Sequence, residues 1–251
     1  MIETLGLIDD ANPLAKAVIS VYGGSGVGKS EIASILSYYL STLNIGSYIL
    51  SGDNYLHRIP MFNDAERLRI FRCGGLEKLI AKGKYTLQVR DELQKLQIEG
   101  VDSDFAQADS DDSKAWLSTY QKAGYLALQS YLGTSNELNL EELSSIVTQF
   151  KSCADKIWLK RMGREPHELW YEQVDMSDTK VLFIEWTHGN NENLYGVDIP
   201  IYLHSTLEQT LTHCKKRNRD SNTESHFICL VLKAEQELLR SQEGSAFIVV
   251  E

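Results

Sequence analysis

Apolar residues are spaced in two different ways along this chain of 251 residues. At Ala17–Tyr22 and Ser47–Leu50 they form short β-rich runs, which are typical of buried strands. Between these runs, Lys29–Leu43 carries apolar residues three and four positions apart, so the pattern predicts an amphipathic helix that ends near Asn44 and Gly46. Strand, glycine-rich loop, helix and strand in this order predict a βαβ unit of a parallel sheet.

Strand-like segments return late in the chain. We expect three further strands, at Val181–Ile184, Ile199–Leu203 and Ala246–Val250, and two helices, at Thr206–Lys216 and Phe227–Arg240. With the first two strands this makes an α/β fold, in which a doubly wound, mainly parallel five-stranded sheet is covered by helices.

The middle of the chain is different. From residue 63 to about residue 161 the periodicity is helical and no convincing strand is found, and Leu140–Trp158 predicts one amphipathic helix. We therefore expect a single domain over residues 1–251, with a mainly helical insert at about 63–161 that serves as an acceptor subdomain.

Charge and composition exclude several classes of protein. Lys plus Arg number 25 and Asp plus Glu 35, so the net charge is −10, which argues against nucleic acid or a membrane surface as the main partner. The apolar run Phe227–Leu232 is too short to span a membrane, and the first ten residues contain no Lys or Arg, unlike a secretory signal. Four scattered cysteines are typical of a cytoplasmic protein with free thiols. The sequence leaves open whether the chain forms a homo-oligomer.

A phosphate-binding loop follows the first strand, with the sequence Gly23-Gly24-Ser25-Gly26-Val27-Gly28-Lys29-Ser30. It satisfies the pattern GxxxxGK[ST] between a buried strand and a strong helix. Its backbone N–H groups and the helix N-terminus suit phosphate oxygens, Lys29 suits the β- and γ-phosphates, and the Ser30 hydroxyl suits Mg²⁺. The loop predicts a P-loop NTPase fold that binds a nucleoside triphosphate.

Two carboxylates stand at predicted strand ends. Glu185 follows four apolar residues, as a Walker B acid does, and we expect it to reach Mg²⁺; a carboxylate that only caps the strand is the alternative. Asp53 follows the second strand, where a kinase needs a base for the acceptor hydroxyl; a turn-forming Asp is the alternative. Tyr55, His57 and Arg58 are candidates to border the acceptor.

These motifs resemble the phosphoribulokinase/uridine kinase family of P-loop kinases. The resemblance rests on the glycine-rich loop, Gly52-Asp53-Asn54-Tyr55 with His57-Arg58, and Glu185 at the end of an apolar strand. It implies an ATP-dependent kinase with Asp53 as base. By the same likeness, Arg217 and Arg219 in a basic lid contact the phosphates of ATP, and Asp175 in Pro166–Ser177 lies at the acceptor site. For the two arginines, a basic helix C-terminus favoured by the helix dipole is the alternative.

A second likeness is to adenylylsulfate kinase. It rests on Gly52-Asp53-Asn54 and the later Arg67-Leu68-Arg69, but position 51 is Ser where that family has Asp. A protein of another class, a nucleotide-binding regulator without phosphotransfer, is a further alternative. No Asn/Thr-Lys-x-Asp motif for guanine is present, so a GTPase is disfavoured.

The acceptor itself is a small molecule whose identity the motifs leave open. Basic residues cluster at Arg58, Arg67, Arg69 and Arg72 and again at Lys160, Arg161 and Arg164, which would suit an anionic sugar derivative better than a nucleoside. Solvated charged helix faces are the alternative. His188 lies on the loop after the Glu185 strand, so it joins Arg161 and Arg164 as a candidate acceptor contact.

Overall fold

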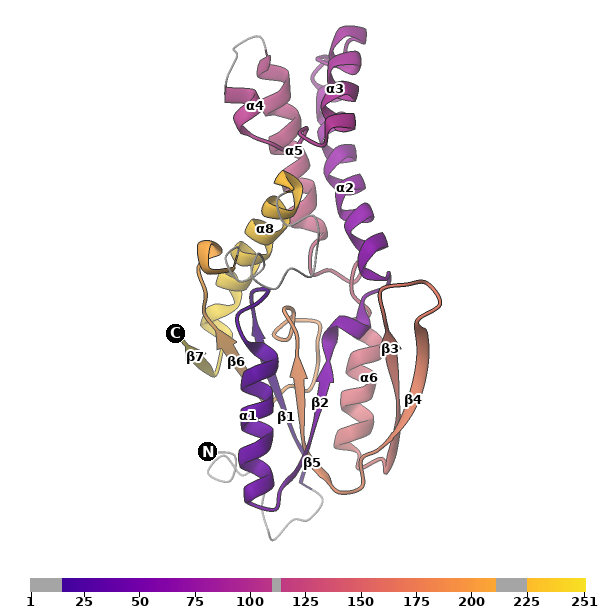
Figure 1. The fold of residues 1–251 in the computed structure, drawn as a ribbon, viewed down its shortest axis with the longest axis vertical. Coiled ribbons are helices and arrows are strands. Elements are labelled where there is room, and N and C mark those ends of the chain that lie inside the picture. The colour runs from indigo at the N-terminus through magenta and orange to yellow at the C-terminus, as the bar shows by residue number, and fades with distance from the viewer. Residues whose placement is uncertain (1–14, 110–113, 211–224) are drawn as a thin grey trace.

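The computed structural model describes residues 15–109, 114–210 and 225–251, in which strands and helices are arranged as a broad body with a narrow arm (Figure 1). The elements of the body are β1 (Ala17–Gly23), α1 (Lys29–Thr42), β2 (Gly46–Ser51), the 3₁₀ helix η1 (Gly52–Tyr55), α6 (Leu140–Lys151), β3 (Lys156–Met162), β4 (Leu169–Asp175), β5 (Thr179–Glu185), β6 (Ile199–Leu203), η3 (Glu243–Ser245) and β7 (Ile248–Val250). The arm and its base contain α2 (Pro60–Ala81), α3 (Leu87–Glu99), α4 (Ala106–Asp109), α5 (Ala115–Tyr131) and α8 (His226–Gln242).

Five strands form one parallel sheet in the order β2-β5-β1-β6-β7, which confirms the predicted α/β class. The register pairs Val21 with Glu185 and Ser51 with Glu185, so the carboxyl ends of β1, β2 and β5 lie level with one another. Ligands of open α/β sheets bind at this edge of the strands.

Helices cover both faces of the sheet because neighbouring strand residues point to opposite sides. Ile19 packs on one face with Ala33 and Leu40 of α1. Val18, one residue earlier, packs on the other face with α6 residues such as Phe150. The hairpin of β3 and β4 extends this second layer beside α6 (Figure 1).

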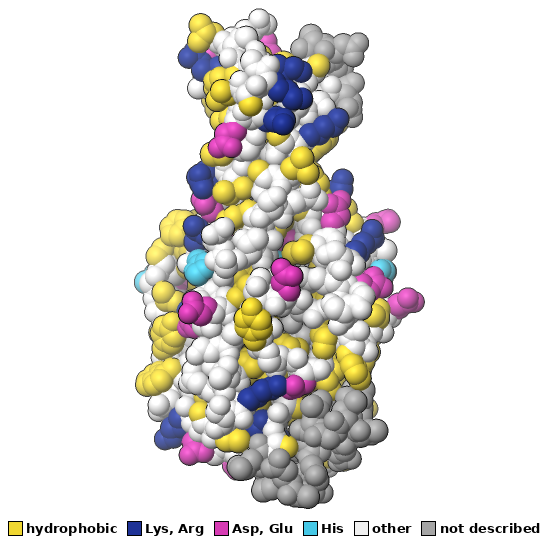
Figure 2. Space-filling view, turned by 180° about the vertical axis from the view of Figure 1, so that it is seen from behind, with side chains coloured by type: hydrophobic (Ala, Val, Ile, Leu, Met, Phe, Trp, Pro, Cys, Tyr) yellow, Lys and Arg dark blue, Asp and Glu magenta, His cyan; other side chains and the backbone are white. Residues whose placement is uncertain are grey.

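The arm rises from the carboxyl edge of the sheet, and Figure 2 shows from behind that it is narrower than the body. Its core joins α2, α3, α5 and α8. The ring of Phe71 on α2 lies edge-on to Tyr120 of α5 and to Phe227 of α8, at centroid distances of 5.7 and 5.8 Å. Helix α8 is therefore packed into the arm although it follows most of the sheet in the sequence.

The predicted helix Leu140–Trp158 is wrong in its second half. Helix α6 ends at Lys151, and β3 begins at Lys156. The chain turns at Cys153, whose φ is 61°, and the N–H groups of Cys153 and Ala154 bond to the carbonyls of Phe150 and Gln149. This is a Schellman end with Cys where Gly is usual. The prediction of no strand before residue 161 fails for the same reason.

Other predicted elements are found within a few residues of their expected bounds. The helix Phe227–Arg240 lies inside α8, and the closing strand is β7. Of the helix Thr206–Lys216, residues 207–210 are helical and the rest lie outside the described residues. In the described parts of the chain, no helix is both long and apolar enough to cross a membrane, and the three cysteines there are free thiols.

Candidate active site

The phosphate loop curls between β1 and α1. Gly26 and Gly28 have φ angles of 77° and 98°, which are left-handed values that favour glycine. The Lys29 ammonium group donates to the carbonyls of Gly23 (3.1 Å) and Gly24 (2.9 Å), so it lies across the loop that it follows. This arrangement places a cation and the N-terminus of α1 on the same side, as phosphate binding requires.

Ser30 and Glu185 meet at the carboxyl end of β5. The Ser30 hydroxyl donates to Oε2 of Glu185 at 2.7 Å. A hydroxyl and a carboxylate are oxygen ligands that Mg²⁺ accepts, and proteins bind Mg²⁺ with one or two such groups and substrate phosphates. No cluster of three or more His, Cys, Asp or Glu that could hold a metal occurs among the described residues.

Asp53 lies in η1, directly after β2. Gly52 before it lies against the Trp186 ring, and the Trp186 indole donates a hydrogen bond to the Asp53 carboxylate. Water reaches Asp53 from the cavity, but surrounding protein raises the pKa of its carboxyl, and the charges of Lys29 and Arg67 only partly oppose this shift. A raised pKa suits a carboxylate that accepts a proton during a reaction.

One cavity of about 540 Å³ collects these groups. The sequence-predicted residues that line it are Ser25, Gly26, Gly28, Lys29, Ser30, Asp53, Arg164, Glu185 and His188. The strand ends, the phosphate loop and α8 thus enclose one polar space that is large enough for a small molecule.

Other predicted acceptor residues lie outside the cavity lining. Tyr55 is fully buried, and the Lys160 ammonium group lies 5.4 Å from the centre of its ring. His57 is exposed and bonds through Nε2 to the carbonyl of Ser135 at 3.0 Å. Arg58 donates to the Tyr131 hydroxyl at 3.1 Å. Their part in acceptor binding stays a prediction.

The same holds for two residues of the β3–β4 hairpin. Arg161 donates to the Tyr48 hydroxyl at 2.6 Å and to Glu172 at 3.0 Å. Asp175 is exposed, and Ser177 donates to its carboxylate. Arg217 and Arg219 lie outside the described residues.

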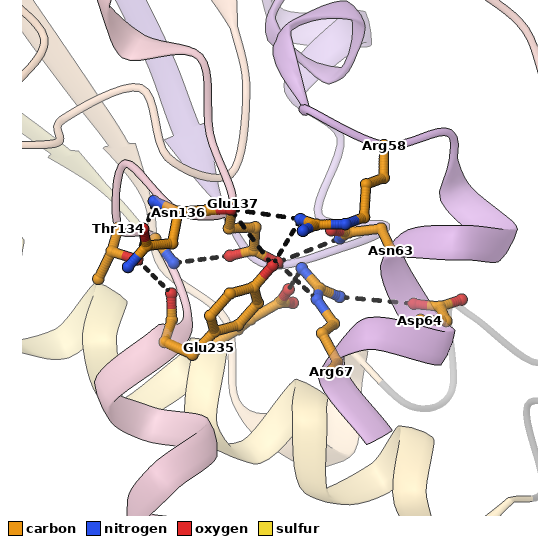
Figure 3. A network of polar contacts seen from close by, with 10 residues as sticks. Arg58, Asn63, Asp64, Arg67, Thr134, Asn136, Glu137 and Glu235 are labelled. Carbon is orange, nitrogen blue, oxygen red and sulfur yellow. Dashed lines mark hydrogen bonds and ion pairs between the residues drawn. The ribbon is translucent and has the colours of Figure 1, made fainter. Parts of the chain in front are cut away.

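A buried ion-pair network borders the cavity and was not predicted (Figure 3). Arg67 of α2 donates from Nε to Oε1 of Glu137 at 2.6 Å and from a terminal nitrogen to Oε1 of Glu235 at 3.1 Å. Asn63 donates to the same Glu137 oxygen at 3.1 Å, and the Gly133 amide donates to Oε2 at 2.7 Å. The network joins α2, the loop before α6, and α8.

Burial and neighbouring charges shift the pKa values of this network: burial raises the pKa of Glu235, and Arg67 only partly opposes that shift. Burial alone would lower the pKa of Arg67, but the carboxylates of Glu235 and Glu137 outweigh it and raise that pKa. Burial would raise the pKa of Glu137, yet Arg67 lowers it. His188 is buried beside the network, and burial lowers its pKa to about 4, so it is neutral at pH 7.

Comparisons with known proteins find relatives by sequence and by fold. A curated protein, the bifunctional α-galactosidase/sucrose kinase AgaSK of Mediterraneibacter gnavus, is 34% identical over 241 residues. The match covers 96% of this chain, which spans about a fifth (20%) of the length of that relative. No protein-family model matches the chain.

Solved structures show the same fold at low sequence identity. A presumed fructose transport system kinase from Silicibacter has a TM-score of 0.59 and 11% identity, and covers 99% of this chain and 95% of its own. A possible uridine kinase from Bacillus stearothermophilus has a TM-score of 0.52 and 17% identity, and the match covers 99% of this chain and 94% of that one. Phosphoribulokinase from Rhodobacter spheroides has a TM-score of 0.52 and 15% identity, and the match covers 91% of this chain and 68% of that one.

The chain therefore has the fold of P-loop small-molecule kinases. The resemblance to the phosphoribulokinase/uridine kinase family that its motifs predict is confirmed at the level of the fold. The curated relative is a kinase by one of its two names.

Proposed function

We propose that the chain is a kinase that transfers the γ-phosphoryl group of Mg·ATP to a hydroxyl of a small carbohydrate. The observation that carries this proposal is the single cavity that holds Lys29, Ser30, Glu185 and Asp53. The first three suit a triphosphate and its metal ion, and the fourth suits an acceptor hydroxyl. A regulator that only binds a nucleotide would have no use for the last group.

The proposed mechanism gives each side chain one task. Lys29 and the loop amides bind phosphate oxygens, and Ser30 with Glu185 would hold Mg²⁺, which neutralises phosphate charge when bound. Asp53 accepts the proton of the acceptor hydroxyl. At the same time the oxygen of that hydroxyl bonds to the γ-phosphorus, and the bond from the γ-phosphorus to the bridging oxygen breaks and releases ADP.

A carbohydrate acceptor is supported by the curated relative. Of the two activities in that name, the kinase fits this chain, because a glycosidase uses paired carboxylates and no phosphate loop. Sucrose is therefore the first acceptor to test. An anionic sugar derivative, a nucleoside and adenylylsulfate, which the motifs also allow, are the comparison compounds.

The test is ADP release from Mg·ATP with sucrose, fructose, glucose, uridine, ribulose 5-phosphate or adenylylsulfate as acceptor. Asp53→Asn is run beside the wild type, with Asp178→Asn, at an exposed position outside the cavity, as the matched control. We expect acceptor-dependent release that collapses in Asp53→Asn alone. Equal, slow release by all three proteins with every acceptor would favour the regulator and overturn the proposal.

A further inference from the structure

The two basic clusters contribute little positive charge to the cavity. Their members are paired with carboxylates: Arg58 and Arg69 with Glu66, Arg72 with Asp102, Arg161 with Glu172, and Lys160 with Glu142. Arg58 and Arg69 share one carboxylate and keep one positive charge between them, but of all the members of the two clusters only Arg67 and Arg164 line the cavity. This weakens the support for an anionic sugar derivative.

One end of the cavity, lined by Asn63, Asp64, Arg67 and Glu235, is negative on balance. We name it the acceptor end, since Arg67 is within electrostatic reach of the base Asp53. Three carboxylates lie within 4 Å of the Arg67 guanidinium: Glu137 at 2.6 Å, Glu235 at 3.1 Å and Asp64 at 3.7 Å. Arg67 is one cation against three carboxylates; burial raises the pKa of Glu235, so the negative charge of this end rests chiefly on Glu137 and Asp64, and neutral His188 adds nothing to offset it.

Hydrogen-bond acceptors are also in excess there. Within the described parts of the chain, Oε2 of Glu235 has no donor, because the bond from Arg67 goes to Oε1. Oδ1 of Asn63 has no partner either, but it is shielded from the cavity and is not open to a ligand. A sugar hydroxyl can donate to Oε2 of Glu235, whereas a phosphate dianion or a sugar-acid carboxylate offers only further acceptors.

We propose that Glu235, supported by Arg67 and Asn63, makes the site specific for uncharged polyhydroxyl acceptors and excludes sugar phosphates and sugar acids. This inference rests on the proposed function and assigns its specificity to a residue of α8. Glu235 is 12% exposed, so a bound sugar would shield its contacts from water. The exposed Arg164 is a further cation of the cavity lining. If Arg164 bound an anionic acceptor, the site would prefer charged sugars, and the test below includes this outcome.

The test compares matched pairs of acceptors: fructose with fructose 6-phosphate, glucose with gluconate, and sucrose with sucrose 6-phosphate. We expect kcat/KM to be at least about 100-fold higher for the neutral member of a pair that is used, because like charges in a desolvated site are strongly unfavourable. Glu235→Gln keeps the shape and can still accept from Arg67. It should raise KM for the neutral acceptor about tenfold, with kcat and the KM for ATP nearly unchanged.

Glu237→Gln is the matched control, since Glu237 lies on the same helix but is exposed and bonds to Tyr125 and Gln129. Thermal melts of all variants check that they fold. Preference for an anionic member that is lost in Arg164→Gln would overturn the inference and leave the kinase standing. An unchanged acceptor KM in Glu235→Gln would also overturn it. No phosphorylation of any sugar would overturn the proposed function itself, and the inference with it.

Discussion

Trp186 lies so close to Gly52 that a Cβ on Gly52 would stand 2.2 Å from the Cγ atom of its ring. Gly52 has no left-handed φ angle, so its lack of a side chain serves this close approach. The contact joins the carboxyl ends of β2 and β5, and the same indole bonds to Asp53. The position of Asp53, the proposed base, therefore depends on Gly52, which has no side chain.

Gly52→Ala should damage catalysis more than folding. The new methyl group must displace Trp186 or the backbone, which we expect to cost about 1–3 kcal/mol of unfolding free energy. A displacement of about 1 Å at Asp53 should lower kcat about 100-fold. Urea denaturation and acceptor-dependent ADP release measure the two effects. Gly244→Ala, where an added Cβ has open space, is the control; equal kcat losses in both variants would contradict the explanation.

Asp53→Asn should remove the acid limb of the pH profile. The base must be deprotonated to accept a proton. Because its pKa is raised, kcat/KM of the wild type should begin to decrease on acidification while the pH is still above the usual carboxyl pKa of about 4. The variant should retain about 1% of kcat or less, without that limb. A wild-type profile that stays flat down to pH 4 would show that Asp53 is not the base.

Glu185→Gln should weaken the dependence of activity on the metal ion. The amide keeps an oxygen near Ser30 but loses the charge, so we expect the Mg²⁺ concentration for half-maximal activity to rise about 10- to 100-fold. A magnesium titration of ADP release measures this shift. Glu192→Gln, at an exposed loop position, should titrate like the wild type. Identical titrations for both variants would remove Glu185 from the metal site.

His188 should make the fold less stable in mild acid. Its pKa is about 4 in the folded chain and about 6.5 when unfolded, so only the unfolded chain takes up a proton between these values. Stability is therefore complete above pH 6.5 and is lost as the pH falls toward 4. We expect His188→Asn to remove about 2 kcal/mol of the change in unfolding free energy between pH 7 and pH 5. His57→Asn, at an exposed site, should leave the change as it is in the wild type.

The sheet and the phosphate loop were predictable because their signals are local. The run Ala17–Tyr22, the glycines after it and the spacing in Lys29–Leu43 lie within one short stretch of sequence. Asp53 and Glu185 could be placed at one edge because parallel strands end together. The structure places Ser51, two residues before Asp53, opposite Glu185.

The hairpin of β3 and β4 escaped prediction for a physical reason. Apolar spacing continues past the end of α6, and the turn uses Cys153 in a conformation that normally signals itself by glycine. On β4, Trp170 and Tyr171 are both exposed, so the alternation that reveals a half-buried strand is missing.

The ion-pair network had no local signal either. Glu137 and Glu235 stand 70 and 168 positions from Arg67, and no spacing rule connects them. In the sequence, Arg67 stands out only as a member of a basic cluster. Its significance depends on the packing of α2 against α8, which is a property of the tertiary structure.

The two parts of the site therefore stand on different hydrophobic cores. The base and the phosphate loop stand on the sheet core, whereas Arg67 and Glu235 stand on helices of the arm core. Substitutions that adapt the arm to a new acceptor need not disturb the machinery that handles the nucleotide. Descendants of one ancestral chain could thus diverge in what they phosphorylate while keeping how they phosphorylate it.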